Sequence, residues 1–181
     1  GFRLPLMEAE SGHGGYRSVL RSIAGISIFS GIAVAAAIYG LDYLFTVMGT
    51  ALSTHQDIAP VWQKMLAAFY GGITEEILMR LFLMSLFTWI GMKIFKQKQP
   101  TTAGISISIF VVAIIFGLGH LPITASLVNI DTLIVIRAIV LNGIGGVVFG
   151  WLFWKKGLES AMIAHFTADV FLLTLLPMLF N

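Results

Sequence analysis

The sequence has no cysteine and few charged residues. The absence of cysteine excludes disulfide bonds and catalysis by a thiol. Charged residues make up only 11% of the chain, whereas soluble proteins typically have roughly 25%. The net charge is only +2 and the basic residues are dispersed, which argues against nucleic acid as a partner.

The chain is instead rich in long segments of hydrophobic residues. Hydrophobic residues form 57% of its 181 residues and the mean hydropathy is +0.92, more than a soluble domain of this size could bury. Spanning a bilayer takes about 20 helical residues, and the apolar segments of that order are Val19–Met48, Trp62–Ile94, Ala103–Gly119, Thr132–Trp154 and Leu158–Leu179. We therefore predict an all-α, polytopic transmembrane bundle of about five spans. Residues 1–15 are predicted to be a polar lead-in that is exposed or disordered, and residues 16–181 a single transmembrane domain.

The basic residues predict the orientation. Eight of the eleven Lys and Arg residues lie in alternate connecting segments: Arg3, Arg17 and Arg21, then Lys93, Lys96 and Lys98, then Lys155 and Lys156. Positively charged loops face the cytoplasm, so we predict a protein of the plasma (inner) membrane with a cytoplasmic N-terminus and its C-terminus outside. Asp131 and Arg137, near the start of the fourth segment, are predicted to be interfacial anchors.

Ionisable side chains inside apolar segments are costly and mostly functional. Glu76 and Arg80 are four residues apart, so a helix places them within pairing distance on one face. Glu75 is rotated by about 100° from Glu76, which predicts that the two carboxylates point in different directions. The pattern predicts a structural Glu76–Arg80 ion pair and leaves Glu75 as a candidate general base.

Two histidines lie in or beside other apolar segments. His165 and Asp169 are again four residues apart, and a carboxylate beside an imidazole fixes its tautomer and orientation. Phe116 and His120 share a face at the end of the third segment, where Pro122 should end the helix. An acid and two histidines from three helices indicate proton chemistry inside the membrane, either in an enzyme or in the relay of a proton-coupled transporter component.

Three motifs occur in order: EEILMR at residues 75–80, FGLGH at 116–120 and HFTAD at 165–169. They resemble the EExxxR, FxxxH and HxxxN/D motifs of the CPBP family, the CAAX-type and bacteriocin-processing intramembrane endopeptidases also called the Abi family. The resemblance covers about Phe69 to Phe171. It implies an intramembrane endopeptidase that uses activated water to cleave a membrane-associated or lipid-modified polypeptide.

The resemblance also implies roles for the motif residues. Glu75 would take a proton from the attacking water, and His120 would help to hold or activate that water. His165 and residue 169 would stabilise the oxyanion on the scissile carbonyl. The family often has Asn at the last position; an ionised Asp169 cannot donate a hydrogen bond, so it would have to orient His165 or be protonated. The supporting residues would be Glu76, Arg80 and Phe116.

The sequence leaves the cofactor and the substrate open. Glu75, His120 and His165 could supply the three protein ligands of a catalytic Zn²⁺ or another divalent metal. The lack of an HExxH motif favours metal-free chemistry. The expected partners are membrane lipid and a polypeptide such as a prenylated CAAX protein, a bacteriocin leader or a signal-like peptide. A catalytically silent membrane scaffold or an immunity-type subunit remains an alternative.

The expected depth of His165 along its helix differs from those of Glu75 and His120, which is inconsistent with a shared site. At 1.5 Å per residue, Glu75 and His120 lie about 25 Å from their predicted cytoplasmic helix ends, but His165 lies only about 12 Å from Gly157. A common site therefore requires that the turn at Lys155–Gly157 be sunk into the bundle or that the helices be tilted.

Overall fold

The structure, a computed structural model, describes residues 2–5, 7, 15–50 and 59–180. In these residues, five helices are long and apolar enough to cross a membrane: Tyr16–Val47, Val61–Ile94, Thr102–Ala125, Thr132–Lys156 and Leu158–Phe180. The predicted all-α transmembrane bundle is confirmed. Each predicted boundary is within a few residues, except that the third span continues past Gly119 to Ala125.

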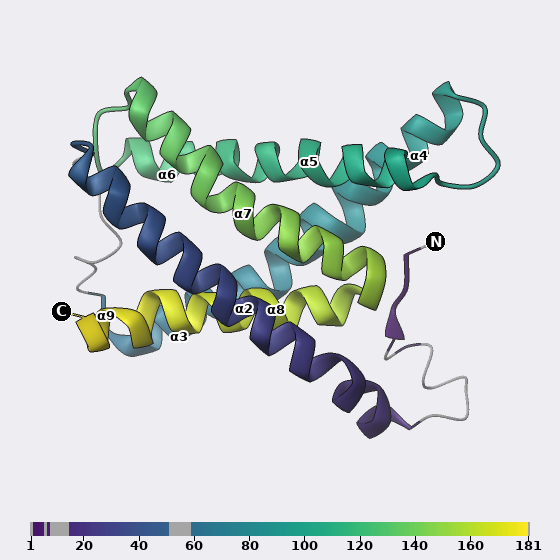
Figure 1. Cartoon of the computed structure of the whole chain (residues 1–181), viewed down its shortest axis with the longest axis horizontal. Helices are drawn as coiled ribbons and strands as arrows, with labels where there is room; N and C mark the ends of the chain where they lie inside the picture. The colour runs from purple at the N-terminus through teal and green to yellow at the C-terminus, as the bar shows by residue number, and fades with distance from the viewer. Residues whose placement is uncertain (1, 6, 8–14, 51–58, 181) are drawn as a thin grey trace.

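The second and fifth spans change their helix type along their length. The order is α2 (Tyr16–Val47), α3 (Val61–Phe69), η2 (Tyr70–Glu75), η3 (Ile77–Met84), α4 (Ser85–Ile94), α5 (Thr102–Gly119), α6 (Leu121–Ala125), α7 (Thr132–Lys156), α8 (Leu158–Val170), η4 (Phe171–Leu175) and α9 (Leu176–Phe180). The η segments are π-helical. Such segments are rare in proteins, and those that occur are often at functional sites. Figure 1 shows α5 and α8 running along the long axis, with α2 and α7 crossing it obliquely.

The helix starts follow local capping rules. Thr101 caps α5 by accepting a hydrogen bond from the Gly104 amide at 3.1 Å, and Asp131 caps α7 by accepting one from the Ile134 amide at 2.8 Å. Such caps satisfy amide groups that the first helical turn leaves unpaired. Pro122 ends α5 as predicted, but it also lies in the first turn of α6, a position where proline's missing N–H costs nothing.

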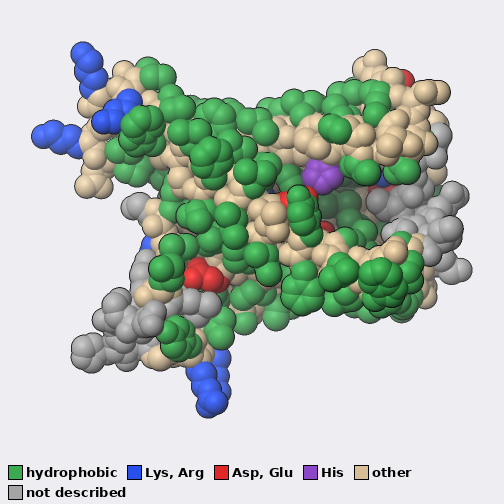
Figure 2. Space-filling view, turned by 180° about the vertical axis from the view of Figure 1, so that it is seen from behind, with side chains coloured by type: hydrophobic (Ala, Val, Ile, Leu, Met, Phe, Trp, Pro, Cys, Tyr) green, Lys and Arg blue, Asp and Glu red, His purple; other side chains and the backbone are tan. Residues whose placement is uncertain are grey.

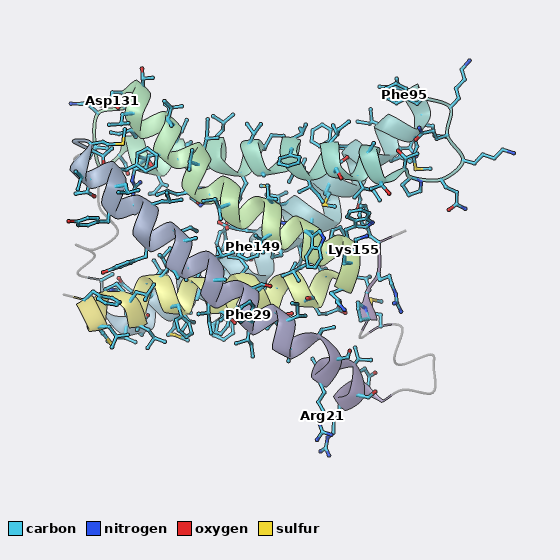
Figure 3. All side chains as sticks on the ribbon, viewed as in Figure 1. Arg21, Phe29, Phe95, Asp131, Phe149 and Lys155 are labelled. Atoms are coloured by element: carbon cyan, nitrogen blue, oxygen red, sulfur yellow. The ribbon has the colours of Figure 1, made fainter. Side chains whose placement is uncertain are left out.

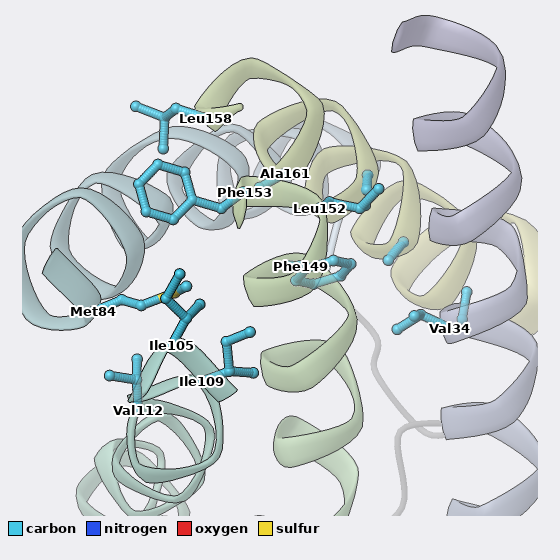
Figure 4. Close-up of a cluster of buried hydrophobic side chains, with 13 residues drawn as sticks. Val34, Met84, Ile105, Ile109, Val112, Phe149, Leu152, Phe153, Leu158 and Ala161 are labelled. Carbon is cyan, nitrogen blue, oxygen red and sulfur yellow. The ribbon is translucent and has the colours of Figure 1, made fainter. Parts of the chain in front are cut away.

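The core lies where α5, α7 and α8 meet. Figure 4 shows Phe149, Leu152 and Phe153 of α7 among Ile105 and other apolar side chains of this cluster. The helices approach closely because small residues face each other: a Cβ on Gly146 would lie 2.7 Å from the Cβ of Ala113. Contacts of this kind drive helix association in lipid, where no hydrophobic effect operates between helices.

The turn between α7 and α8 is recessed and covered by the N-terminal segment. The Leu158 amide donates to the Arg3 carbonyl at 3.2 Å, and the Phe2 ring stacks on Phe153 at 4.5 Å. Phe2 and Leu4 pack against the core and Pro5 is buried, so the prediction of an exposed or disordered lead-in does not hold for these three residues, whereas Arg3, Met7 and Gly15 are exposed. Residues 1, 6 and 8–14 lie outside the described part. Lys155 lies nearer the middle of the long axis than Phe95 (Figure 3), and this recess brings His165 to the level of Glu75.

Candidate active site

The paired acids of the second span meet one imidazole from the fifth. Glu76 Oε1 lies 2.7 Å from His165 Nδ1, and Glu75 Oε2 lies 3.8 Å from His165 Nε2. The two carboxylates approach the ring from different directions, as predicted, but they converge on the two nitrogens of one imidazole, which the sequence did not reveal. The acids lie where the π-helical segments η2 and η3 adjoin: Glu75 ends η2 and Glu76 precedes η3.

The predicted Glu76–Arg80 ion pair is confirmed. Arg80 Nε lies 3.2 Å from Glu76 Oε2, and both side chains are essentially inaccessible. Arg80 Nη2 also donates to the Gly146 carbonyl at 3.3 Å. The guanidinium carbon lies 5.4 Å from the centre of the Phe116 ring and 5.8 Å from that of Phe149, so two aromatic faces stabilise the buried cation.

Asp169 lies on the other side of the imidazole from Glu76. Its Oδ2 is 3.7 Å from His165 Nε2, while Glu76 takes Nδ1. Glu76 therefore orients His165, a role that the sequence reasoning gave to Asp169. Both Asp169 and Glu75 are separated from Nε2 by more than a direct hydrogen bond, a spacing that suits a bridging water or a substrate oxygen.

Gly71 and Gly72 of η2 let α8 approach the acids. A Cβ on Gly71 would collide with Asp169 Oδ2 and would lie 3.1 Å from His165 Nε2. A Cβ on Gly72 would lie 2.8 Å from the Cβ of Phe166. Any larger residue at position 71 would therefore displace the carboxylate of Asp169.

His120 ends α5 with its tautomer fixed by the backbone. Its Nδ1 lies 2.8 Å from the Phe116 carbonyl oxygen, which can only accept, so Nδ1 carries the hydrogen and Nε2 is left for other partners. The Phe116 ring makes edge contacts with both imidazoles, with centroids 4.8 Å from His120 and 5.8 Å from His165. Phe116 thus spaces the two histidines.

A cavity of about 750 Å³ joins these groups, and Glu75, His120, His165 and Asp169 all line it. Figure 2 shows a histidine and acidic side chains in a hollow between apolar surfaces. The volume is within the range of about 300–1,000 Å³ typical of ligand pockets. The structure thus brings the predicted reactive residues of three spans to one cavity.

The candidate metal ligands do not form a group around a common point. Across the described ranges, no three His, Cys, Asp or Glu side chains are grouped closely enough to hold one. Glu75, His120 and His165, the trio that the sequence offered, therefore do not fit a three-ligand zinc site in this arrangement.

Sequence reasoning missed a second buried ion pair on the cavity wall. Arg137 was predicted to lie at the membrane interface, but it is only 7% exposed and donates from Nε to Asp42 Oδ1 at 2.7 Å. Asp42 lies in α2, 95 residues away in the chain, so no local spacing could reveal the pair. Both are charged residues within apolar segments, which was the one signal available.

The part of the chain that carries the site is similar to a known family. A family model described as type II CAAX prenyl endopeptidase, Rce1-like, matches residues 57–171, more than half of the chain. The chain belongs to this Rce1-like family. The resemblance to CAAX proteases is confirmed, and all three motifs lie inside the matched range. No curated protein and no solved structure is a significant match to the chain.

Proposed function

We propose that this Rce1-like protein is an intramembrane endopeptidase that cleaves a lipid-modified or membrane-associated polypeptide with water activated by Glu75. The observation that carries the proposal is the cavity, in which two partly exposed carboxylates, Glu75 and Asp169, and two imidazoles face a shared space inside an apolar bundle. A transporter relay or a silent scaffold would not require a pocket of peptide size beside them.

Glu75 is the base in the proposed reaction. One Glu75 carboxylate oxygen accepts a proton from water while the water oxygen attacks the scissile carbonyl carbon. The carbonyl π electrons move to oxygen and form the oxyanion. When this intermediate collapses, the C–N bond breaks and the protonated Glu75 returns its proton to the leaving amine, so that one water is consumed for each bond.

The remaining groups position the reactants. His120, with its hydrogen on Nδ1, offers Nε2 as an acceptor for the attacking water. His165 donates Nδ1–H to Glu76 and turns Nε2 toward Glu75 and Asp169. In the imidazolium form Nε2–H stabilises the oxyanion, and Asp169 in its acid form provides a second donor.

The test is cleavage of an S-farnesylated fluorogenic peptide, with the cysteine fourth from its C-terminus, by the purified protein in nanodiscs. Glu75→Gln and His120→Ala should each lower kcat by about 100-fold or more, the usual range for a lost general base. Lys98→Gln, a change in an exposed connector, is the control and should leave kcat unchanged. A wild-type protein that cleaves nothing, or a Glu75→Gln variant at the wild-type rate, would refute the proposal.

Two further arms test the substrate and the metal. The same peptide without the farnesyl group shows whether the lipid contributes to KM. Because no described acid–histidine trio is arranged to hold a metal, we expect a strong chelator to leave the rate unchanged. Loss of activity with the chelator, restored by Zn²⁺ alone, would show that the water is activated by a metal instead.

A further inference from the structure

The cavity extends beyond the acid–histidine cluster along α7. Its lining includes Arg137, Leu141, Gly145 and Phe149, which follow one another at intervals of four residues and so lie on one broad helix face. The Phe149 ring stacks on His165 at 4.7 Å, which places Phe149 at the reactive end. Arg137 precedes Phe149 by twelve residues in α7, about 18 Å along the axis at 1.5 Å per residue.

Arg137 is a buried cation that the proposed reaction does not use. Its Nε lies 2.7 Å and its Nη2 2.5 Å from Oδ1 of the fully buried Asp42. This contact fixes the plane of the guanidinium through one of its edges, and Nη1 belongs to the other. Arginine is suited to carboxylates because its planar fork offers parallel N–H donors.

Charge is unevenly distributed along this cavity. Glu75 and Asp169 lie at the His165 end, whereas Arg137 is the sole Lys or Arg among the described lining residues. A carboxylate on a bound polypeptide would be repelled at the acidic end, whereas at the other end it can accept hydrogen bonds from the edge of the Arg137 guanidinium that Asp42 does not contact. An extended chain advances by about 3.3–3.6 Å per residue, so that the about 18 Å between the two ends accommodates about five residues or fewer.

We propose that Arg137, held by Asp42, is a subsite for the C-terminal carboxylate of the substrate. The new element is the residue assigned to the chain end, which lies about 18 Å along α7 from Phe149. This inference rests on the proposed peptidase function, and it adds the residue that recognises the chain end. Asp42 acts as a positioning residue, since it touches the guanidinium and not the substrate.

The test compares two farnesylated peptides that differ only in a C-terminal acid or amide. The wild-type protein in nanodiscs should cleave the acid with a kcat/KM at least tenfold higher, and the difference should lie in KM. Arg137→Gln should bring the acid-to-amide ratio close to one, and Arg137→Lys should restore part of it as a point charge. Arg21→Gln, an exposed change in α2, is the matched control and should keep the wild-type ratio.

A variant that fails to fold does not block this test. If Arg137→Gln does not accumulate, Arg137→Met combined with Asp42→Leu removes both charges with little loss of packing, and its ratio should also be close to one. A wild-type ratio near one, or a preference for the acid that survives either variant, would overturn the subsite.

A binding measurement separates the failure of the subsite from that of the peptidase. The tripeptide Ala-Ala-Leu should raise the thermal stability of the wild-type protein as the acid but not as the amide, and Arg137→Gln should abolish this difference. Acid-specific stabilisation without cleavage of any peptide would sustain the subsite and reject the peptidase. Cleavage without any acid-specific effect would sustain the peptidase and reject the subsite. The Asp42–Arg137 pair would then have a structural role between α2 and α7.

Discussion

The Glu76–Arg80 pair offers a way to separate stability from catalysis. Glu76 is fully buried and contacts both Arg80 Nε at 3.2 Å and His165 Nδ1 at 2.7 Å. Glu76→Ala would leave the inaccessible Arg80 cation with the Gly146 carbonyl, at 3.3 Å, as its remaining hydrogen-bond acceptor among the described residues. Removing one partner of a buried pair typically costs about 3–5 kcal/mol.

Removing both charges should reverse most of that loss. The pair Glu76→Leu with Arg80→Met keeps the volume and leaves no uncompensated charge, so its stability should be close to that of the wild type. Its activity should not return, since His165 Nδ1 has lost the carboxylate that orients it. Glu75→Ala should likewise keep nearly full stability and lose activity, because Glu75 is 22% exposed in the cavity and its removal leaves no buried charge unpaired.

Thermal unfolding in one detergent and the peptide cleavage assay provide the two readouts. We expect Glu76→Ala to be destabilised and inactive, the double variant stable and inactive, and Glu75→Ala stable and inactive. If the double variant is as unstable as Glu76→Ala, the loss does not come from an unpaired Arg80. If it is active, Glu76 does not orient His165.

Two further changes test the close approach of α8 and the orientation in the membrane. Gly71→Ala would place a methyl group against Asp169, and we expect at least a tenfold fall in kcat with about 1–3 kcal/mol of destabilisation. The control is Gly91→Ala, which has open space around it and should change neither kcat nor stability. Equal rates for the two variants would show that the reaction does not need Asp169 at this position. Since the chain has no cysteine, each of the variants Ser126→Cys and Gln99→Cys carries a single cysteine. The first lies on the predicted outer side of the membrane and the second on the predicted cytoplasmic side. A membrane-impermeant maleimide should label Ser126→Cys in intact cells and Gln99→Cys only after permeabilisation, and the opposite pattern would invert the predicted orientation.

Local features of this molecule could be predicted from sequence. The five spans follow from apolar length, and the Glu76–Arg80 pair follows from a spacing of four residues. The contact between Phe116 and His120 follows from the same rule and is present at 4.8 Å. Each of these depends on one helix, and the geometry of one helix is known before the fold is.

Contacts between helices were beyond such reasoning. Glu76 and His165 are 89 residues apart, and only the packing of α8 on η2 and η3 joins them. The position of Arg137 was missed for the same reason, since a basic residue near a helix start is also typical of the interface. The π-helical turns at the acids were missed because hydropathy does not distinguish one helix type from another.

The division of labour between the two neighbouring acids follows from their surroundings. Both oxygens of Glu76 are engaged, one by Arg80 and one by His165, and no face of this side chain is accessible. Glu75 is partly exposed to the cavity, and its closest recorded partner in the described residues is His165 Nε2 at 3.8 Å. A carboxylate can accept a proton from water only where water reaches it, so Glu75 is suited to the reaction and Glu76 to holding the imidazole. Two neighbouring acids that contact one ring thus differ in exposure, and the buried one holds the imidazole while the accessible one takes part in the chemistry.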